Sequence, residues 1–542
     1  MRTQADAETF DYIVVGAGSA GCVLAGRLSE DPRATILVLE AGGRDSSPII
    51  KMPAATDLYG IGNPKYDWRY LTEPDPSRCG RRDVWPRGKV VGGSSSINAM
   101  VYMRGQRSDY DSWAELGNIG WSFDEVLPFF KASETNEGGA DEWRGRDGPL
   151  RVSHIRTLHP LAVDFVEAAK NTGIRFSKDL NGRDFEGVGY VQATQRFGRR
   201  HSAADAYLTP ALRRKNVSLL CRALVSRILI KDNVATGVEY LDANGRRTLA
   251  HAREAILLSG GAIASPQIMM LSGLGPGDTL RRHGIAVVKN IPNMGRNLQD
   301  HPGLYLNYAV DRPTYNSQQG PLHKVLHGLT WLLFGRGPGT TPGALAMAYV
   351  KSNNVALYPD LQLHFTPVGY RLTPEQLIIL DDPVITVIPN VNRPYSRGWV
   401  ELASADIRDP PRIECRLLED ERDVFVLIAG CRILRRICAT PPLANRIMAE
   451  LTPGPDISSD EELAAFIRAN CITIFHPCGT CRMGIDEAAV VDPQLRVRGI
   501  DRLRIVDASI MPHLVSGNIN APVIMIGERG ADFVRQSNRR SA

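Results

Sequence analysis

Two polar side chains close to the C-terminal end of the sequence have the chemistry to move a proton and to hold a developing charge. His476 follows the apolar run Ile472–Phe475 and precedes Pro477. An imidazole titrates near neutral pH and can act as a general base, although a lone histidine is more often structural. Asn520 lies in the segment SGNINAP, where its amide could donate to an anion or cap the following helix. We take both as candidate catalytic residues.

Other familiar catalytic and metal-binding patterns do not occur. The sequence contains neither a G-x-S-x-G nucleophile elbow nor an H-E-x-x-H zinc motif, and no carboxylate cluster. Cys478 and Cys481 form one C-x-x-C pair, which offers only two ligands and has no second pair at zinc-ribbon spacing. The nine cysteines are an odd, scattered set, which favours reduced and mostly buried thiols. We therefore expect no metal.

The first part of the chain carries a dinucleotide-binding pattern. Tyr12–Val15 is a short apolar run typical of a strand buried on both faces. It leads into Gly16-Ala17-Gly18-Ser19-Ala20-Gly21, a complete G-x-G-x-x-G that precedes a helical pattern. Gly16 makes the tight turn, Gly18 lets the backbone approach a pyrophosphate, and Gly21 lets the helix pack closely on the strand. The amide groups that start the helix then face the phosphates.

A second expected strand, Ala34–Leu39, ends in an acidic residue at a suitable distance. Glu40 lies about twenty residues after the glycine motif, where a carboxylate can accept both hydroxyl hydrogens of an adenosine ribose. The same charge would repel a 2′-phosphate, so an NADP-type cofactor is disfavoured. A tight βα turn in an empty α/β domain is the simpler alternative, and the fingerprint alone does not distinguish FAD from NAD.

Two further segments are candidates for contact with the same cofactor. Gly88–Met100 ends a long irregular stretch, and such a stretch in a compact enzyme is usually a functional loop. Its glycines and serines suit a flat polar ring, although an ordinary polar loop is an equally good interpretation. Asp507 follows the expected strand Leu503–Val506, and ligands of open α/β sheets bind at that end of the strands.

The expected elements before residue 312 continue the dinucleotide domain. Val217–Leu220, Val225–Ile230 and Gly237–Tyr240 predict an antiparallel meander. Ala255–Ser259 predicts another buried strand, and Ala264–Leu271 predicts the helix that follows it.

The middle of the chain, from about residue 312 to 457, differs in character. Leu361–Thr366, Ile385–Pro389 and Gly398–Leu402 predict strands of an antiparallel sheet, and Asp420–Arg436 has the spacing of an amphipathic helix. We interpret this block as a substrate domain. The apolar run Leu329–Phe334 would suit an entrance or a membrane surface, but packing into the core is the interpretation we favour.

Length and charge limit the class of protein. The 542 residues are enough for two or more domain-sized cores. A net charge of +5 is small against 64 basic and 59 acidic residues and is not gathered in a basic block, so we expect no nucleic-acid partner. No segment has the apolar length of a membrane span, and the first ten residues lack the pattern of a secretory signal. We expect a cytoplasmic protein.

Five separated segments of the chain carry motifs that follow one another in a characteristic order. They are GAGSAG with Glu40, GKVVGGSSSINAM at 88–100, GGAIASPQIMMLSGLGP at 260–276, NMGRNLQDHP at 293–302, and HPCGTCRMG with VDASIMPHLVSGNINAPVIMIGE at 476–528. Over essentially its whole length the chain thereby resembles the glucose–methanol–choline (GMC) family of FAD-dependent oxidoreductases. This resemblance, and not composition, favours FAD over NAD.

The resemblance implies an α/β fold with an α+β part. We expect a split Rossmann-like FAD-binding domain and a substrate domain whose antiparallel sheet is backed by helices. The FAD-binding domain would take residues 1–155, 196–311 and 465–542, and the substrate domain residues 156–195 and 312–464.

The resemblance also implies site residues. His476 matches the family's active-site histidine and Asn520 its partner, while Val225 matches an adenine contact and Asp507 and Ala508 match contacts near the pyrophosphate and ribityl chain. The expected cofactor-binding residues are Gly16, Gly18, Ser19, Ala20, Gly21, Glu40, Ala41, Trp68, Val91, Gly93, Ser94, Asn98, Ala99, Met100, Val101, Val225, Asp507, Ala508, Asn518 and Pro522.

The activity implied by the resemblance is the oxidation of a primary or secondary alcohol. His476 would take the hydroxyl proton, Asn520 would donate to the alkoxide, and FAD would take the hydride and pass electrons to a quinone, an artificial acceptor or oxygen. The motifs resemble those of the choline dehydrogenase-like branch of the family. No cage of a carboxylate and aromatic rings for a quaternary ammonium can be placed in the sequence. Ile97 occupies the loop through which some members hold FAD by a histidine, so we expect non-covalent FAD. A redox-neutral flavin-bound lyase or decarboxylase is the alternative, and peripheral membrane contact is compatible with either.

Overall fold

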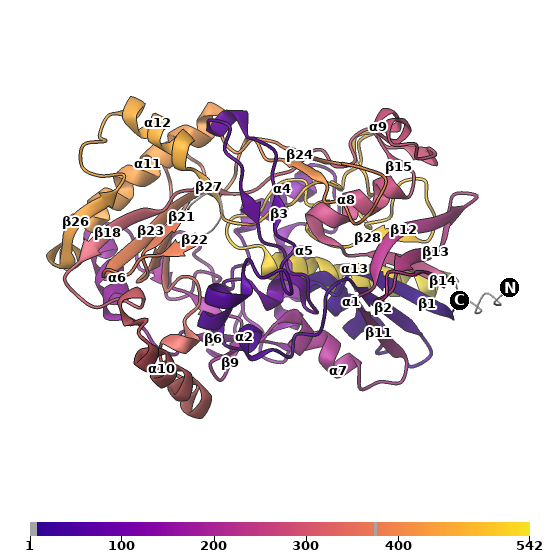
Figure 1. The fold of residues 1–542 in the computed structure, drawn as a ribbon, viewed down its shortest axis with the longest axis horizontal. Helices are drawn as coiled ribbons and strands as arrows, with labels where there is room; N and C mark the ends of the chain where they lie inside the picture. Colours follow the sequence, from indigo (N-terminus) through magenta and orange to yellow (C-terminus); the bar gives the residue numbers. More distant parts are fainter. Residues whose placement is uncertain (1–7, 373–376, 542) are drawn as a thin grey trace.

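The computed structural model describes residues 8–372 and 377–541, and the first seven residues, part of the segment considered above as a signal, lie outside them. Two large β-sheets, each covered by helices, lie side by side in the described part of the chain (Figure 1). The chain passes from one sheet to the other and back, so that residues far apart in sequence meet between them. The expected α/β class, with one Rossmann-like and one antiparallel sheet, is confirmed.

The first sheet has a parallel part and an antiparallel flap. β1 lies between two parallel neighbours, so that Val14 pairs with Val38 on one side and with Leu257 on the other. β2 is buried along its whole length, as a strand covered on both faces must be. The strand order is β11 (Val217–Cys221), β2 (Ile36–Glu40), β1 (Glu8–Val15), β14 (Arg247–Leu258), β13 (Val234–Leu241) and β12 (Leu224–Lys231), with β28 (Leu503–Ile505) also paired to β14.

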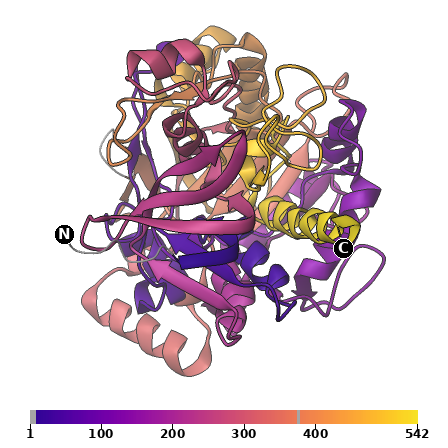
Figure 2. The same cartoon turned by 90° about the vertical axis from the view of Figure 1, so that its right-hand side faces the viewer.

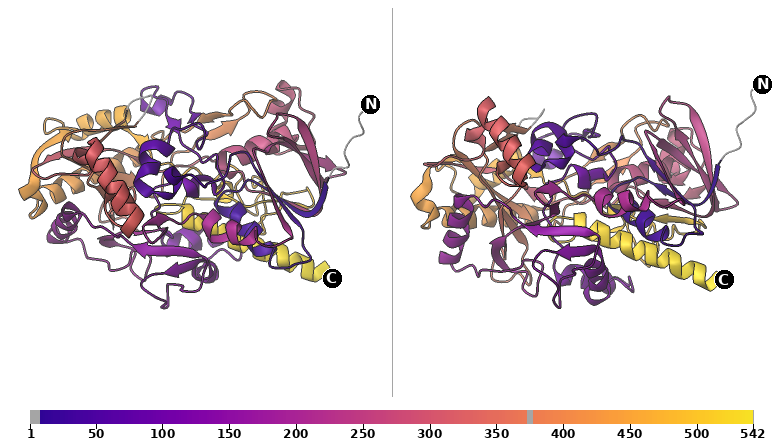
Figure 3. Two further views of the ribbon diagram at one scale, coloured as in Figure 1. Left: turned by 60° about the horizontal axis from the view of Figure 1, so that its bottom comes forward. Right: turned by 90° about the horizontal axis from the view of Figure 1, so that it is seen from below.

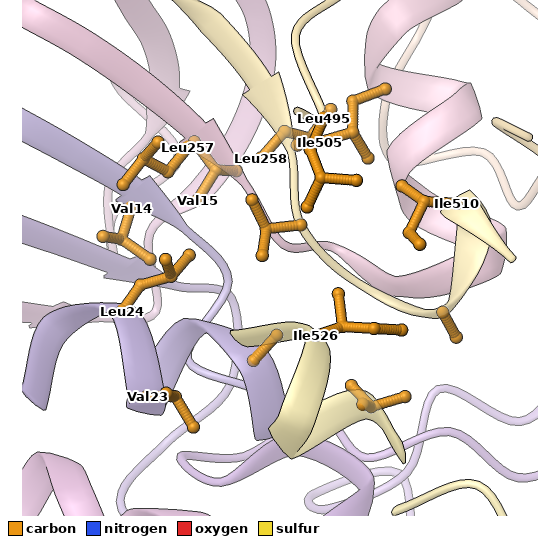
Figure 4. Close-up of a cluster of buried hydrophobic side chains, with 14 of the residues drawn as sticks. Val14, Val15, Val23, Leu24, Leu257, Leu258, Leu495, Ile505, Ile510 and Ile526 are labelled. Carbon is orange, nitrogen blue, oxygen red and sulfur yellow. The ribbon is translucent and has the colours of Figure 1, made fainter. Parts of the chain in front are cut away.

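Helices from both ends of the chain pack against this sheet. α1 (Ser19–Leu28) packs against α13 (Asn520–Ser541). Figure 2 shows α13 in yellow beside the strands of the first sheet. Figure 4 shows side chains of β1, β14, β28, α1 and α13 directed toward one another in a single apolar core. The C-terminal segment therefore packs in the same apolar core as the first sheet. Other helices of this region are α4 (Arg107–Glu115), α5 (Phe123–Ser133), α8 (Gly261–Leu271) and α9 (Gly277–Arg282).

β11 differs from the expected meander. It pairs in parallel with β2, and only β12, β13 and β14 form antiparallel hairpins. The chain reaches β11 through the helical turns of residues 204–211, after a connection from β2 that is long enough to return the strand parallel to its neighbour. The prediction of a three-stranded meander beginning at Val217 is therefore wrong in its first strand.

The second sheet is antiparallel and has two chemically different faces. In β20, Leu361, Leu363 and Phe365 belong to one apolar core with the helix α11 (Glu421–Cys438), whereas the intervening Gln362, His364 and Thr366 point to the opposite face. α6 (Pro160–Asn171) and α12 (Asp460–Asn470) pack on the same helical layer. The strand order is β26 (Ile447–Thr452), β18 (Leu306–Val310), β23 (Val384–Val391), β20 (Leu361–Thr366), β19 (Ala346–Val350) and β7 (Gly187–Tyr190), with β17 (Pro302–Gly303) and β27 (Ile472–Thr473) at one side.

The expected strand Gly398–Leu402 is not part of this sheet. Residues Trp399–Glu401 form β24, which pairs only with β25 (Arg412–Glu414) among the described residues. The backbone groups of Gly398 and Val400 bond instead to the loop at Gly295 and Leu298. β24 and β25 therefore form a separate two-stranded sheet, so the prediction was wrong about the sheet to which this strand belongs.

The apolar run Leu329–Phe334 is not core. It forms the end of α10 (Pro321–Phe334), in which Trp331 is the one buried side chain. The helix stands out from the body of the molecule (Figures 1 and 2). No helix in residues 8–372 or 377–541 is both long and apolar enough to cross a membrane.

Candidate functional site

The glycine turn after β1 packs against a second glycine turn. A Cβ on Gly16, which has φ +96°, would lie 2.6 Å from the carbonyl oxygen of Ser259, and a Cβ on Gly21 would lie 1.9 Å from the carbonyl oxygen of Gly16. Gly93 has φ +53°, and a Cβ there would lie 2.7 Å from Cα of Gly18. No side chain fits at these positions, so bare backbone forms the cradle that a pyrophosphate requires.

The N-termini of α1 and α13 lie next to each other. Ser19, the first residue of α1, donates from Oγ to Oδ1 of Asn520, the first residue of α13, over 2.8 Å. Neither helix has an acidic residue in its first turn, which in α13 includes Pro522. Two helix N-termini therefore direct unpaired N–H groups and positive dipole ends to one place. This arrangement suits a diphosphate anion.

Glu40 is fixed at the end of β2. Its Oε2 accepts from the N–H of Ala17 over 2.9 Å and its Oε1 from that of Gly42 over 2.7 Å. Burial raises the pKa of this carboxyl to about 7, against the effect of those two hydrogen bonds. The N–H of Ala223 donates to the backbone oxygen of Glu40, which brings β12 with Val225 alongside.

Asp507 organises the edge at which β28 ends. Its Oδ2 accepts from the N–H of Gly261 over 2.8 Å and from the hydroxyl of Ser265 over 2.6 Å. Its Oδ1 accepts from the N–H of Ser509, so the carboxylate caps the short helical turn that begins at Ala508. The strand end and the start of α8 are thereby joined beside the glycine cradle.

The loop from Gly88 to Val101 is held by hydrogen bonds within the loop and by bonds to neighbouring segments. Val91 donates to the carbonyl of Gly43, and the N–H of Gly88 donates to Oγ of Ser94. Oδ1 of Asn98 accepts from Arg200 and from the N–H of Met100, which has φ +61°. The other predicted residues are placed as follows: Ala20 is buried in α1, Ala41 follows β2, Trp68 stacks on Tyr70 beneath Lys89, Ala99 contacts Gly343, and Val101 bridges to Ala193.

His476 lies in the loop that follows β27. Its backbone N–H donates to Oδ1 of Asp300 over 2.8 Å, and the N–H of His301 donates to the same oxygen over 2.7 Å. The hydroxyl of Thr473 donates to the other oxygen of Asp300. Burial raises the pKa of this carboxyl to about 6. One buried carboxyl group therefore aligns the backbones of two histidines from separate segments.

The hydrogen bonds of the two imidazoles define their tautomers. Nδ1 of His301 lies 2.9 Å from Nδ1 of His476, and Nε2 of His301 lies 3.0 Å from the carbonyl oxygen of Asn392. A carbonyl only accepts, so Nε2 of His301 must carry the hydrogen. Neutral His301 then has a bare Nδ1, which accepts from Nδ1–H of His476. His476 consequently presents an unprotonated Nε2.

Both imidazoles are held neutral by their surroundings. Burial lowers the pKa of His301 to about 3. Burial also lowers the pKa of His476 well below its usual value. At neutral pH Nε2 of His476 is therefore unprotonated and can accept a proton, as a general base requires.

Asn518, and not Asn520, is the neighbour of His476. Nδ2 of Asn518 lies 3.2 Å from Nε2 of His476 and donates to it, while Oδ1 of Asn518 is buried without a partner among the described residues. Asn520 begins α13 and is turned toward Ser19. The expected pairing of His476 with Asn520 is therefore corrected: the helix starts at Asn520, so that the preceding segment, turned at Gly517 (φ +84°), carries Asn518 into the site.

The polar face of the second sheet supplies further groups. Nε2 of His364 lies 2.9 Å from Oδ1 of Asn390 on the adjacent strand. Nδ2 of Asn390 and Oε1 of Gln362 are buried and unpaired in the described structure. Since the charge of His364 contributes to the lowered pKa of His476, this face lies near the candidate base. Buried, unpaired polar atoms are groups that a bound polar ligand would satisfy.

Two family models match the chain and together cover most of it. Residues 10–303 and residues 394–527 each match a model described as GMC oxidoreductase. The chain belongs to the GMC oxidoreductase family. The FAD implied by this family fits the glycine cradle, the paired helix N-termini and Glu40 described above.

Named relatives of this GMC oxidoreductase act on alcohols. The chain is 44% identical to human choline dehydrogenase, mitochondrial, across 97% of this chain and 90% of the relative. It is 41% identical to the alcohol dehydrogenase [acceptor] of Pseudomonas putida, across 97% and 95% of the two chains. Its structure superimposes on pyridoxine 4-oxidase from Mesorbium loti with a TM-score of 0.87 at 35% identity, covering 98% and 99% of the chains.

Four polar residues near His476 were not predicted from the sequence. Asp300 and His301 lie in NMGRNLQDHP, a segment that resembled the GMC family but received no role. His364 lies in an expected strand and Asn390 directly follows another, and a polar residue among apolar neighbours was the available signal. In a strand covered by helices on one face, such alternation marks the side that faces a site.

Proposed function

We propose that this GMC oxidoreductase converts a primary or secondary alcohol to the carbonyl compound, with His476 as the base. Alcohol-oxidising relatives support the reaction class. The observation that carries the proposal is the unprotonated Nε2 that the His301 bond imposes on His476. That nitrogen is directed to Asn518 at the end of the cofactor-binding segment.

The chemical step transfers one proton and one hydride from the same carbinol. The hydroxyl proton goes to Nε2 of His476, the C–H hydrogen leaves with its electron pair, and the C–O bond becomes double. Bound FAD supplies the acceptor for that hydride. When His476 becomes a cation, its Nδ1–H continues to donate to His301, and a bond from a charged donor is the stronger one.

Asn518 replaces Asn520 as the proposed alkoxide donor. Its amide has two hydrogens, of which one already points to Nε2 of His476, so a substrate oxygen placed between them would accept from it. A donor directed at developing negative charge contributes about 10²–10³ in rate in other enzymes. Asn520 is assigned to the cofactor's phosphates together with Ser19.

FAD is proposed to bind without a covalent link. Ile97 is buried with Ile50, Tyr66 and Val90, and its side chain has no nucleophilic atom. Electrons then pass to a quinone, an artificial acceptor or oxygen. The proposed substrate is a primary or secondary alcohol.

Anaerobic stopped-flow reduction of the bound flavin tests the proposal. We expect an alcohol to bleach the flavin of the wild-type protein, and we expect His476→Ala to retain FAD but lose most of that reduction. His251→Ala, which changes an imidazole on β14 of the first sheet, is the matched control. Unimpaired reduction in His476→Ala would remove the base from the mechanism, and a wild-type flavin that no alcohol bleaches would favour a redox-neutral lyase or decarboxylase.

A further inference from the structure

α10 presents an apolar stripe to solvent. Its large apolar side chains are between 48% and 79% exposed, except for the buried Trp331. All of them except Phe334, which ends the helix, recur three or four positions apart and so lie along one side of the helix. The exposed residues are Leu322, Val325, Leu326, Leu329, Leu332, Leu333 and Phe334.

A neighbouring hairpin holds the helix in place and carries an exposed aromatic side chain. Nε1 of Trp331 donates to the carbonyl of Gly198 over 2.9 Å, and the guanidinium of Arg199 lies 5.1 Å from the centre of the Trp331 ring. Phe197, at the tip of the hairpin formed by β9 (Gln195–Arg196) and β10 (Arg199–Arg200), is 69% exposed. The stripe is thus fixed to the body through one tryptophan and remains otherwise open.

The chain segment that contains α10 carries basic residues and no acidic ones. Residues 312–359 contain no aspartate or glutamate, whereas Lys324 and Arg336 are exposed at the two ends of the helix. Arg196 and Arg199 add two cations on the hairpin. An apolar stripe bordered by cations is the pattern of a helix that lies in the interface of a membrane with anionic lipids.

The length of α10 excludes a membrane span. Fourteen residues at a rise of 1.5 Å give about 21 Å, against a hydrocarbon core of about 30 Å. Figure 3 shows the helix lying along the surface, beside the helical turns of residues 48–60, in both views. In those turns Leu58 and Tyr59 are also exposed, which widens the apolar area.

We propose that α10 and Phe197 dock this protein on an anionic lipid bilayer, with the apolar stripe at the boundary of headgroups and acyl chains. Lys324 and Arg336 would then lie at the lipid phosphates. A second copy of the chain is a poorer occupant, because two copies joined through this stripe would face cations toward cations with no carboxylate on α10 to pair with them. The docking surface is independent of the proposed alcohol oxidation.

Vesicle flotation of the FAD-loaded protein tests this surface. We expect the wild-type protein to float with vesicles of phosphatidylcholine mixed with phosphatidylglycerol, to bind pure phosphatidylcholine less, and to be partly released by high salt. The triple change Leu326→Glu, Leu329→Glu and Leu333→Glu should lower binding at least about tenfold, since burial of a single leucine side chain is worth that much. The pair Lys324→Glu and Arg336→Glu should abolish the preference for the anionic lipid.

A matched control changes exposed apolar residues elsewhere. Phe425 on α11 and Met448 on β26 are 64% and 73% exposed, and Phe425→Glu with Met448→Glu should bind vesicles as the wild type does. Alcohol-dependent reduction of a soluble dye should be equal in all variants, which shows that they fold. The proposal is overturned if the wild type stays out of both vesicle fractions or if the triple variant floats normally. It is also overturned if the stripe variant only converts a dimer to a monomer in sedimentation.

Discussion

Replacement of His301 by alanine examines the bond that sets the tautomer of His476. Without His301, the buried Nδ1–H of His476 has no acceptor. A hydrogen bond to a group that becomes charged contributes about 1.5–3 kcal/mol, and at 1.36 kcal/mol per factor of ten its loss corresponds to about 10–150-fold in rate. We therefore expect His301→Ala to reduce its flavin with alcohol about 10–150-fold more slowly in anaerobic stopped flow, with FAD still bound.

The pH dependence separates this role from a structural one. The pKa of His476 is held low chiefly by burial. Without the acceptor at His301 the His476 cation loses a stabilising hydrogen bond, so its pKa should fall further. A base with a lower pKa stays unprotonated to lower pH, so the acid limb of the variant's rate should lie at lower pH than that of the wild type. A residue with only a packing role would not move this acid limb.

Two further variants complete the test. His301→Gln offers an amide oxygen to Nδ1–H of His476 and an amide hydrogen to the carbonyl of Asn392, and should recover much of the rate. His201→Ala removes another buried imidazole, which accepts from the N–H of Arg151, and should leave the acid limb unchanged. The reasoning is refuted if His301→Ala keeps the wild-type rate and acid limb, or if glutamine at this position is no better than alanine.

Three other predictions concern the amides and the cofactor. Asn518→Ala should lower alcohol-dependent flavin reduction by about 10²–10³, while Asn520→Ala should instead weaken FAD binding, and stopped flow with FAD titration separates the two effects. Because the pKa of Glu40 is about 7 without FAD and ribose donors would lower it, the complex binds fewer protons than the apoprotein, so FAD affinity should fall about tenfold from pH 8 to pH 6. Flavin-fluorescence titration measures this, and a dependence that persists in Glu40→Gln contradicts it. Acid precipitation should release all flavin from the polypeptide, since Ile97 cannot form a bond to it; flavin retained on the protein would contradict non-covalent binding.

Features set by local backbone chemistry could be predicted from the sequence. The turn at Gly16 and the contact at Gly21 exclude any side chain, so spacing alone indicated a cradle. Glu40 likewise ends a strand that is buried along its whole length, and the apolar residues of that strand form a continuous run in the sequence. The fold class followed from such strands and from the resemblance to the GMC family.

Features set by long-range contacts could not be predicted in the same way. The choice between Asn518 and Asn520 depends on where α13 begins, and helix boundaries are the least certain part of a sequence-based prediction. The partner of β11 is a strand about 180 residues earlier in the chain, and an apolar run does not name its neighbour. The exposure of α10 depends on the absence of an opposing layer, since an apolar stripe has the same pattern in a core and on a membrane surface.

The two histidines also show why the base could not be assigned from its own segment. Asp300 receives the backbone N–H groups of His301 and His476, so one carboxyl group sets the spacing between two loops. Between the two Nδ1 atoms there is room for one hydrogen, and the carbonyl of Asn392 decides which ring supplies it. The direction of the lone pair on His476 is therefore determined about 80 residues earlier in the sequence, by a backbone carbonyl directly after β23. Any substitution that shifts Asn392 should alter proton transfer as His301→Ala does, even though every side chain of the proposed catalytic pair is retained.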